Sequence, residues 1–397
     1  MEKVITKVKI ENLYKHIFNL EGPRHPIKDL DNLESAREYI VAELDRYGLK
    51  SHQQEFKVDG FDETFKNIEA YTSSDSQPQI ILISHYDTVA NCPGANDNAS
   101  GVALMLECAR VLAQENKDFN VGFLCFSLEE GDPYIELHCN KKAQELGMTD
   151  ELNRYTSVKI HEFMSKYTEL FYSFRSKGKL YIEANQAALN EMTLKTPPIV
   201  ENYFIFWKEL YEELDKKGQN YYTLGSELWL KEALDKKKQI KGILCFDTIA
   251  YTNKKLNSQW FPPSMSPKIL RNIFKTHKVD FDEMVGNFIS IIASKGSDEI
   301  IETFSRNASN ELIDLPYAYA HFNIGYEQIA KTFPDLLRSD HGPFWRENIP
   351  GLFLTDTANF RFPYYHTQAD TIEKLDFGFL TQITKATIAT LIDLNTN

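Results

Sequence analysis

Short apolar runs recur along this chain, and they predict the strands of a sheet. Residues 80–84, 121–128 and 241–246 are rich in branched and aromatic side chains, which is typical of buried strands. Residues 50–58 and 65–71 alternate between apolar and polar side chains and predict two further strands. Apolar positions at helical spacing predict helices at residues 10–20, 33–47, 102–114 and 377–394. This succession of strands and helices indicates an α/β protein.

The pattern changes after the predicted strand at 121–128. Strand signals vanish there, and long, aromatic-rich helical patterns take their place. We interpret residues 132–222 as a helical insertion into an α/β domain formed by residues 1–131 and 223–397. The insertion follows Glu129 and Glu130 directly. We therefore expect it to lie at the rim of the site to which these carboxylates belong, as a lid or a subunit contact.

The last third of the chain gives weaker signals. We expect an irregular segment at residues 251–275, a helix at 281–304, a loop at 339–344 and a short strand at 352–354. Within that loop, Asp340 and His341 are expected to make a structural hydrogen bond rather than to line a substrate pocket.

Composition and charge exclude several classes of protein. With 397 residues, 42% of them hydrophobic and 25% charged, the chain can bury a large core. Its net charge of −13 and the lack of a basic patch argue against nucleic-acid binding. No apolar run approaches the ~18–20 residues of a membrane span, and the N-terminus lacks the apolar core of a secretory signal. The five cysteines show no CxxC spacing, so we expect reduced thiols and a cytoplasmic protein.

Acidic and histidine side chains follow the predicted strands, where open α/β sheets place their sites. His85 and Asp87 follow the strand at 80–84, and Asp97 precedes the next helix. The other candidates follow later strands or stand near the C-terminus: Glu129, Glu130, Asp247 and His366. Two imidazoles and three or more carboxylates suit two zinc-like ions, each held by one histidine and one terminal carboxylate, with an aspartate shared between them.

Two of the remaining carboxylates fit supporting roles. Asp87 can accept the free imidazole N–H of His85 and so fix its tautomer. Neighbours on an extended chain point to opposite sides. One of Glu129 and Glu130 can therefore bind metal while the other takes the proton of a water molecule.

Six motifs stand one after another along the chain. They are Ser84-His85-Tyr86-Asp87, Pro93 to Gly101, Glu129-Glu130, Phe246-Asp247, Ser339-Asp340-His341 and Tyr365-His366-Thr367 with Asp370-Thr371. In this order they resemble the motifs of the co-catalytic (two-zinc) aminopeptidases of the leucine aminopeptidase type, a family related to the glutaminyl cyclases. The resemblance spans roughly residues 35–394, apart from the insertion. It implies a mixed, mostly parallel central sheet flanked by helices on both faces.

The resemblance gives each candidate ligand a place by position. It implies that His85 and Asp247 hold one zinc ion. Glu130 and His366 would hold the other, and Asp97 would bridge the two. Cobalt and manganese can share such ligands, so the native metal stays open between Zn²⁺, Co²⁺ and Mn²⁺.

The same resemblance implies the catalytic residues. Glu129 would act as general base and then as acid to the leaving amine, while Asp87 would orient His85. Tyr365, next to the ligand His366, resembles a tyrosine whose hydroxyl stabilises the tetrahedral oxyanion in some members.

The chain departs from the family pattern at the insertion. In the family a Gly-Ser turn follows the Glu-Glu pair closely, whereas here Gly225 and Ser226 come only after residues 132–222. Without those 91 residues, the separation between Glu130 and Asp247 falls from 117 to 26 positions, a family-like spacing. The insertion therefore bears on the substrate range and not on the ligand set.

These features together predict a zinc-dependent aminopeptidase that acts on peptides with a free N-terminus, through a metal-bound hydroxide and Glu129 as general base. Three alternatives stay open: a glutaminyl-cyclase-like acyltransferase, a carboxypeptidase or deacylase on the same metal centre, and a non-catalytic binding protein. The complete ligand set argues against the last. No nucleic-acid or membrane partner is expected, and a homo-oligomer through the insertion remains open.

Overall fold

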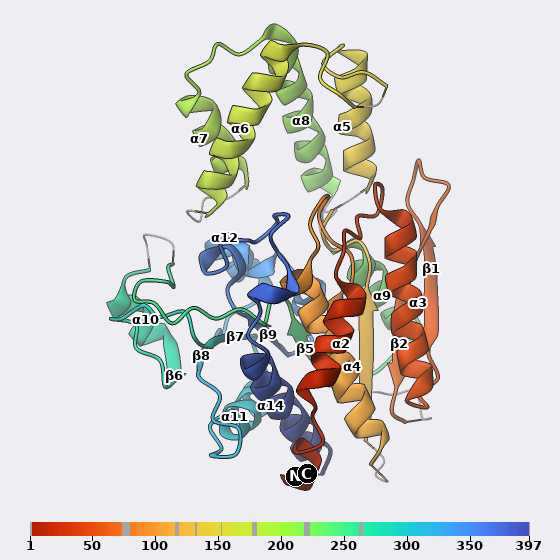
Figure 1. Ribbon diagram of the computed structural model, residues 1–397, viewed down its shortest axis with the longest axis vertical. Helices are drawn as coiled ribbons and strands as arrows, with labels where there is room; N and C mark the ends of the chain where they lie inside the picture. The colour runs from red at the N-terminus through yellow and green to blue at the C-terminus, as the bar shows by residue number, and fades with distance from the viewer. Residues whose placement is uncertain are drawn as a thin grey trace.

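A mixed sheet of nine strands forms the centre of the molecule (Figure 1). The strands are β1 (His52–Lys57), β2 (Thr64–Tyr71), β3 (Ile80–His85), β4 (Val121–Phe126), β5 (Gly242–Phe246), β6 (Phe274–His277), β7 (Ile289–Ala293), β8 (Tyr317–His321) and β9 (Gly351–Thr355). They lie in the order β1-β2-β4-β3-β5-β9-β7-β8-β6. This computed structural model describes residues 2–73, 80–115, 119–131, 133–151, 153–176, 181–217, 223–261 and 265–396.

The four central strands owe their place to apolar side chains on both faces. In β3, Ile80 and Leu82 pack into the core on one face, and Ile81 and Ile83 into the core on the other. Burial on both faces removes the polar alternation of an exposed strand. Strands β4, β3, β5 and β9 run parallel, so their carboxyl ends share one edge of the sheet.

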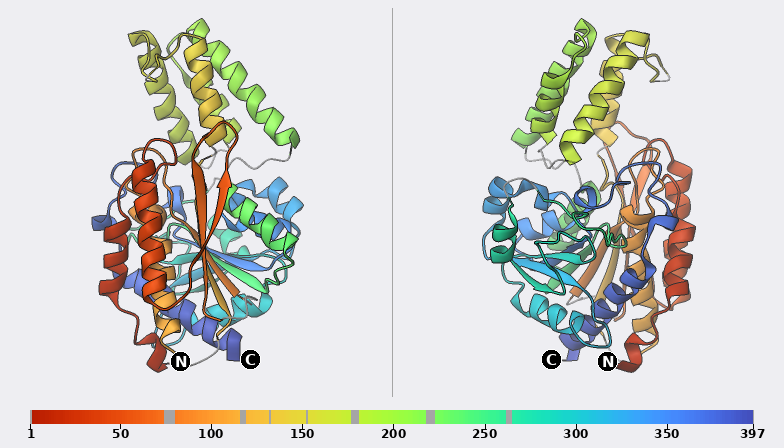
Figure 2. Two further views of the ribbon diagram at one scale, coloured as in Figure 1. Left: turned by 90° about the vertical axis from the view of Figure 1, so that its right-hand side faces the viewer. Right: turned by 60° about the vertical axis from the view of Figure 1, so that its left-hand side comes forward.

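Helices cover both faces of this sheet (Figure 2). On one face, α4 packs against β3 and β4 and is itself covered by α2, α3 and α14, with α11 beside α14. On the other face, α9 and α13 cover the sheet through Trp229 and Phe344. Outside residues 132–222 the helices are α1 (Glu2–Ile5), α2 (Ile10–Leu20), α3 (Leu30–Arg46), α4 (Ser100–Ala113), α9 (Leu224–Asp235), α10 (Pro267–Ile273), α11 (Asp298–Ala308), α12 (Tyr326–Thr332), α13 (His341–Arg346) and α14 (Phe377–Thr396). The predicted α/β class with helices on both faces is confirmed.

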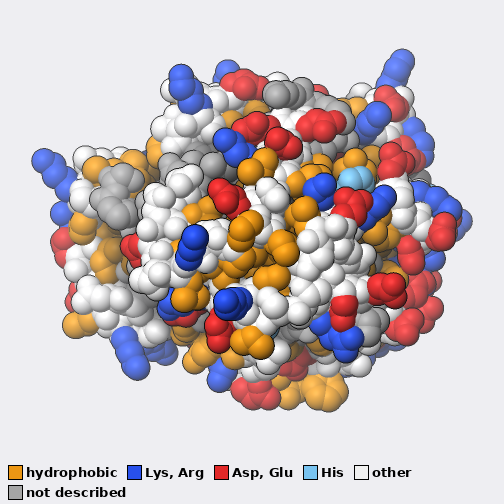
Figure 3. Space-filling model, turned by 90° about the horizontal axis from the view of Figure 1, so that it is seen from above, with side chains coloured by type: hydrophobic (Ala, Val, Ile, Leu, Met, Phe, Trp, Pro, Cys, Tyr) orange, Lys and Arg blue, Asp and Glu red, His pale blue; other side chains and the backbone are white. Residues whose placement is uncertain are grey.

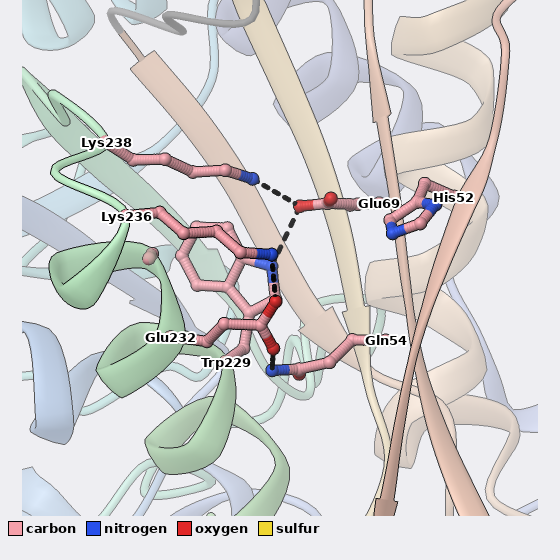
Figure 4. Close-up of a pocket in the computed structure, with 8 residues that line it drawn as sticks. His52, Gln54, Glu69, Trp229, Glu232, Lys236 and Lys238 are labelled. Carbon is pink, nitrogen blue, oxygen red and sulfur yellow. Dashed lines mark hydrogen bonds and ion pairs between the residues drawn. The ribbon is translucent and has the colours of Figure 1, made fainter.

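A polar cluster attaches α9 to the edge strand β1 and its neighbour β2 (Figure 4). Glu69 Oε2 accepts hydrogen bonds from Trp229 Nε1 and Lys238 Nζ, each at 2.9 Å. Gln54 Nε2 donates to Glu232 Oε2 at 2.5 Å. The chain that returns from residues 132–222 is thus fixed to the sheet within its first helix.

Between β4 and α9 the described residues form four helices, at the end of the molecule opposite both termini (Figure 1). They are α5 (Pro133–Glu145), α6 (Val158–Ser176), α7 (Tyr181–Glu191) and α8 (Pro198–Lys217). Glu136 of α5 lies 3.1 Å from His25 Nε2 and 3.4 Å from Lys28 Nζ, and α6 packs against the turn η3 (Ala358–Phe360). The expected ends of the insertion, residues 132 and 218–222, fall outside the described residues. The division into two units therefore stays a prediction.

The predicted helix at residues 281–304 is wrong. The segment contains β7 and only the first part of α11, which begins at Asp298. Ile289, Ile291 and Ile292 are buried in the sheet, and the chain turns at Gly296, whose φ of +83° ends the extended run. The prediction merges a strand and a helix into one element, because short apolar runs fit the period of either.

Two further expectations in the last third need correction. The segment 251–275 is not irregular throughout, because it contains α10 and the first residues of β6. The predicted loop at 339–344 becomes α13 from His341 onward, while the short strand at 352–354 is found as β9. Strand β8 and helix α12 are not among the predicted elements. Among the helices described, none is both long enough and apolar enough to cross a membrane.

Candidate metal centre

Three neighbouring parallel strands bring most of the predicted ligands to one edge of the sheet. His85 is the last residue of β3, and Asp247 follows β5 directly. Glu129 and Glu130 come shortly after the end of β4. Because β3 pairs in parallel with both β4 and β5, these ends meet. His85 and Glu129 are buried, whereas Glu130 and Asp247 are half-buried, so the group opens towards solvent on one side.

Asp97 joins this group from the turn η1 (Ala95–Ala99), which connects β3 to α4. The carboxylate of Asp370 accepts the backbone N–H of Asn96 at 2.8 Å and that of Asp97 at 3.1 Å. Gly94 begins the turn at a φ of +61°, and a Cβ there would lie 2.3 Å from the Thr88 side chain. Glycine is therefore required at this position, and the turn holds Asp97 at the strand ends.

The described residues contain three groups of ligand candidates, of which two share Asp97 and the third joins His85, Glu129 and Glu130. In the first group, His85 Nε2 lies 3.4 Å from Asp97 Oδ1 and 3.8 Å from Asp247 Oδ1. In the second, His366 Nε2 lies 3.1 Å from both Asp97 Oδ2 and Glu130 Oε1. The ligand atoms of each group all lie within 4.8 Å of one another. Each oxygen of Asp97 thus faces a different histidine, as a bridging carboxylate would.

Three buried atoms of these groups form no hydrogen bond within the described residues. One is His85 Nδ1, which lies 3.5 Å from Asp87 Oδ1, and the other two are His85 Nε2 and Asp97 Oδ2. A buried polar atom left without a partner costs about 1–3 kcal/mol, and a metal ion is a partner that His85 Nε2 and Asp97 Oδ2 can both take. Imidazole nitrogen and carboxylate oxygen are ordinary zinc ligands. The residues of both groups therefore fit metal ions.

Burial and crowded negative charge together shape the electrostatics of the cluster. Burial raises the pKa of Glu129 well above its usual range, with His85 opposing and Glu130 adding to the rise. Burial and the charge of Asp97 raise the pKa of Glu130 to about 7. Burial also raises the pKa of Asp97, but the neighbouring imidazoles of His366 and His85 outweigh it and hold that pKa far below its usual range. Cations are needed to keep all of these carboxyl groups ionised together.

Asp87 does more than its predicted role of orienting His85. Its Oδ1 lies 3.5 Å from His85 Nδ1. The same carboxylate accepts the backbone N–H of Glu129 at 3.2 Å and that of Glu130 at 3.0 Å. One buried side chain therefore positions the histidine of the first group and the backbone of both glutamates.

Tyr365 lies beside the second group. Its ring stacks on that of His366, with the centroids 3.8 Å apart and 19° between the planes. Arg338 Nη2 lies 3.5 Å from the Tyr365 hydroxyl oxygen. Burial raises the pKa of Tyr365 well above its usual range, with Arg338 opposing. The phenol is thus a neutral hydrogen-bond donor at physiological pH, next to the predicted ligand His366.

His341 makes the expected structural hydrogen bond. Its Nε2 lies 2.5 Å from the Leu336 carbonyl oxygen, and its ring packs against Trp345 and Phe353. Burial lowers the pKa of His341 to about 3, so the imidazole stays neutral. Asp340 is buried closer to the cluster, where burial raises its pKa to about 7 and His85 opposes the rise.

Sequence reasoning missed Arg24, which lies in a segment interpreted only as a loop. The side chain is 2% exposed, and its guanidinium donates only to backbone carbonyls. These belong to Leu20, Gly22, Tyr86, Pro93 and Gly94. Arg24 thereby ties the N-terminal segment to both ends of the connection that follows β3. No sequence pattern predicts such a contact, because backbone carbonyls are available at every residue.

Comparison with known families and proteins gives a consistent result. The model of Peptidase family M28 matches residues 67–144 and 200–391. Uncharacterized protein YfbL of Escherichia coli (strain K12) is 23% identical over 392 residues, covering 96% of this chain and 87% of that protein. Aminopeptidase YwaD of Bacillus subtilis (strain 168) is 36% identical over 97 residues, 21% of each chain. A probable zinc metalloprotease of Pyrenophora tritici-repentis is 26% identical over 161 residues, 34% of this chain and 33% of that protein.

Solved structures share the fold at low sequence identity. The LapA aminopeptidase of Legionella pneumophila superposes with a TM-score of 0.56 and 13% identity, over 100% of this chain and 74% of that one. The glutaminyl cyclase of Porphyromonas gingivalis gives a TM-score of 0.54 and 15% identity, over 98% and 99% of the two chains.

We expect replacement of the shared aspartate to abolish metal binding in both groups at once. In Asp97→Ala, each histidine loses the carboxylate oxygen that faces it, so both sites lose a ligand. Zinc content per chain, measured after dialysis against a weak chelator, should fall close to zero. Asp314→Ala, which removes an exposed carboxylate far from the strand ends, is the control and should bind as the parent does. Full zinc content in Asp97→Ala would refute the bridging role.

Proposed function

This chain belongs to peptidase family M28, and we propose that it is a two-zinc aminopeptidase that removes N-terminal residues from peptides. It is a zinc-dependent peptidase by family, and peptides are its substrates. The observation that carries the finer proposal is the pair of ligand groups joined by Asp97, with Glu129 beside them. Glu129 Oε2 lies 3.8 Å from His85 Nε2, within reach of a water molecule at the cluster.

In this proposal, His85 and Asp247 hold one ion, while Glu130 and His366 hold the other. Asp97 bridges them. The supporting observations are the separations of 3.1 to 3.8 Å between each histidine nitrogen and its carboxylate oxygens. Zinc is the metal of the family, and cobalt or manganese would fit the same donors.

The side chains of the site then have separate tasks. Zinc ions, when bound, lower the pKa of a water molecule and polarise the scissile carbonyl. Glu129 accepts the proton of the attacking water and returns it to the leaving amine. Tyr365 donates a hydrogen bond from its hydroxyl to the oxygen on which negative charge develops. Asp87 keeps Glu129 in place through the backbone N–H that it accepts.

The following observations bear on the choice between an aminopeptidase, an acyltransferase and a carboxypeptidase or deacylase. The solved glutaminyl cyclases share the fold, which keeps an acyltransferase as the second candidate. Support for hydrolysis comes from His85 and Asp247, which complete a second ligand group beside Asp97, Glu130 and His366. Support for action at the N-terminus, rather than by a carboxypeptidase or deacylase, comes from the similarity to aminopeptidase YwaD.

We further propose that the helices of residues 132–222 form a roof that limits substrate length. Helix α5 begins three residues after Glu130 and is attached through Glu136 to His25 and Lys28. Helix α6 reaches a different part of the catalytic domain, the turn η3 after β9. Attachment on two sides of the strand ends favours short peptides over folded chains.

A homo-oligomer through the insertion is a second proposal for this region. Several large apolar side chains of the insertion are exposed: Tyr155, Val158, Leu194 and Ile205. Figure 3 looks down on this end of the molecule and shows hydrophobic side chains between the charged ones.

For the compartment, the five cysteines, all free and buried, support the reducing cytoplasm that we propose.

A mass-spectrometric time course with three short peptides tests the activity. One peptide has a free N-terminus, one is N-acetylated and one begins with glutamine. An aminopeptidase shortens the free peptide stepwise and leaves the acetylated one intact. Loss of ammonia from the glutamine peptide without shortening would instead identify a cyclase, and cleavage of the acetylated peptide would identify a carboxypeptidase or deacylase.

Glu129→Gln should bind zinc as the parent does and lose about 10²–10⁴-fold in kcat, the usual contribution of a general base. The amide keeps the shape of the side chain but cannot accept the proton. Glu130→Gln is the matched comparison, because it removes a predicted ligand and should lower zinc content. Parent-like kcat in Glu129→Gln would rule out its role as base.

Replacing residues 132–222 by a short glycine turn should raise the rate on long peptides relative to dipeptides. Without the helices of residues 132–222, a substrate peptide that extends beyond its first residues is no longer excluded. The measurement is the ratio of kcat/KM for a long peptide to that for a dipeptide with the same N-terminal residue, together with molecular mass by light scattering. An unchanged ratio and mass in a folded variant would contradict both proposals for the insertion.

A further inference from the structure

The backbone just before the proposed base adopts an unusual conformation. Leu128, between the end of β4 and Glu129, has a φ of +59° and is fully buried. Residues other than glycine rarely adopt this left-handed region, and they persist there only where the surrounding structure holds them. The position of Glu129 therefore depends on whatever holds this turn.

Residues 127–130 and 223–225 form what we call the neck, where the chain leaves for residues 132–222 and returns. The two segments are joined by backbone hydrogen bonds. Leu224 N–H donates to the Leu128 carbonyl at 3.0 Å, and Thr223 N–H donates to the Glu129 carbonyl at 3.3 Å. On the side of the metal cluster, Asp87 accepts the N–H groups of both glutamates, as described above.

Asn67 of β2 closes the opposite side of the neck. Its Oδ1 accepts the Ser127 N–H at 3.1 Å, and its Nδ2 donates to the Gly225 carbonyl at 2.8 Å. The second hydrogen of Nδ2 goes to Gln54 Oε1 at 2.8 Å. The side chain is 1% exposed, so one buried amide holds the outgoing and the returning segment together.

Close packing leaves this amide no other position. A Cβ on Gly225 would lie 2.0 Å from the Ser127 carbonyl oxygen and 2.7 Å from Asn67 Oδ1. The two segments of the neck are thus in direct backbone contact beside Asn67. The amide supplies an acceptor for one segment and a donor for the other, and its second N–H hydrogen is left for Gln54.

We propose that Asn67 is a positioning residue of the peptidase reaction, which fixes Glu129 through the strained turn at Leu128. Asn67 touches none of the predicted ligands and acts only through the backbone of the neck. Loss of its hydrogen bonds frees Ser127 and Leu128 to relax, and Glu129 moves away from the water it activates. This inference rests on the proposed function of Glu129 as base.

The test uses the zinc-loaded 397-residue chain with Asn67→Leu, which keeps the size of the side chain and removes its three hydrogen bonds. We expect kcat to fall by about 10- to 100-fold, because a displacement of ~1 Å at a catalytic group costs that much. KM should stay near the parent value and zinc content should be unchanged. A merely structural role would lower thermal stability without this separation of kcat from KM.

Gln54→Leu is the matched control. Gln54 accepts from Asn67 and also donates to the Leu228 carbonyl at 3.3 Å and to Glu232 at 2.5 Å, so its loss weakens the attachment of α9. It contacts neither Ser127 nor Gly225 in the hydrogen-bond network. We expect a lowered melting temperature with a parent-like kcat.

Asn67→Asp is the second variant and covers the case in which the leucine variant fails to fold. It keeps an acceptor for Ser127 N–H and loses the donation to Gly225, so we expect a partial loss of kcat. Glu129→Gln, measured in parallel, separates the two levels of inference. A parent-like kcat in Asn67→Asp while Glu129→Gln is inactive would overturn the role of Asn67 alone. High turnover in Glu129→Gln would overturn the assignment of the base itself.

Discussion

Repulsion between buried carboxylates is the constraint on which the rest of this structure depends. Asp97, Glu129, Glu130 and Asp247 meet at the ends of parallel strands, where a pair of like charges 4 Å apart costs about 4 kcal/mol at an effective dielectric constant of 20. Burial and the neighbouring carboxylates raise the pKa of Glu129, whereas His366 and His85 hold that of Asp97 down. Metal ions relieve the repulsion, and the fold must hold the side chains in place for them. Much of the surrounding hydrogen bonding serves that purpose.

The elements that build the centre of the fold could be predicted, because their physics is local. Strands β3, β4 and β5 are uninterrupted apolar runs, and such runs fit a sheet covered on both faces. The failures lie where two elements follow each other closely. Residues 281–304 hold a strand and part of a helix, separated by a turn at Gly296, and periodicity alone did not divide them. Tertiary pairing with β8 and β9 decides that β7 is a strand.

The charged residues of the candidate site could be predicted from the sequence. The residues that hold them in place could not. His85, Asp97 and Asp247 stand at strand ends or turns, where the sequence already marks them, and the structure brings them together; their roles as ligands stay predictions. Arg24 and Asn67 bind backbone groups far away in the sequence. Such contacts leave no pattern, because every residue carries a carbonyl and nearly every one an N–H.

The neck shows how a large insertion and a precise site can share one short segment. Residues 132–222 leave the chain directly after Glu130, so any movement of their helices would reach the glutamate pair through the backbone. Two side chains oppose this, since Asp87 holds the pair from the side of the ligand candidates and Asn67 holds Ser127, two residues before the pair, from the sheet. The strain at Leu128 is tolerated because both ends of the turn are held. If these helices control substrate access, as we propose, access can change with them while the sheet sets the position of the glutamate pair.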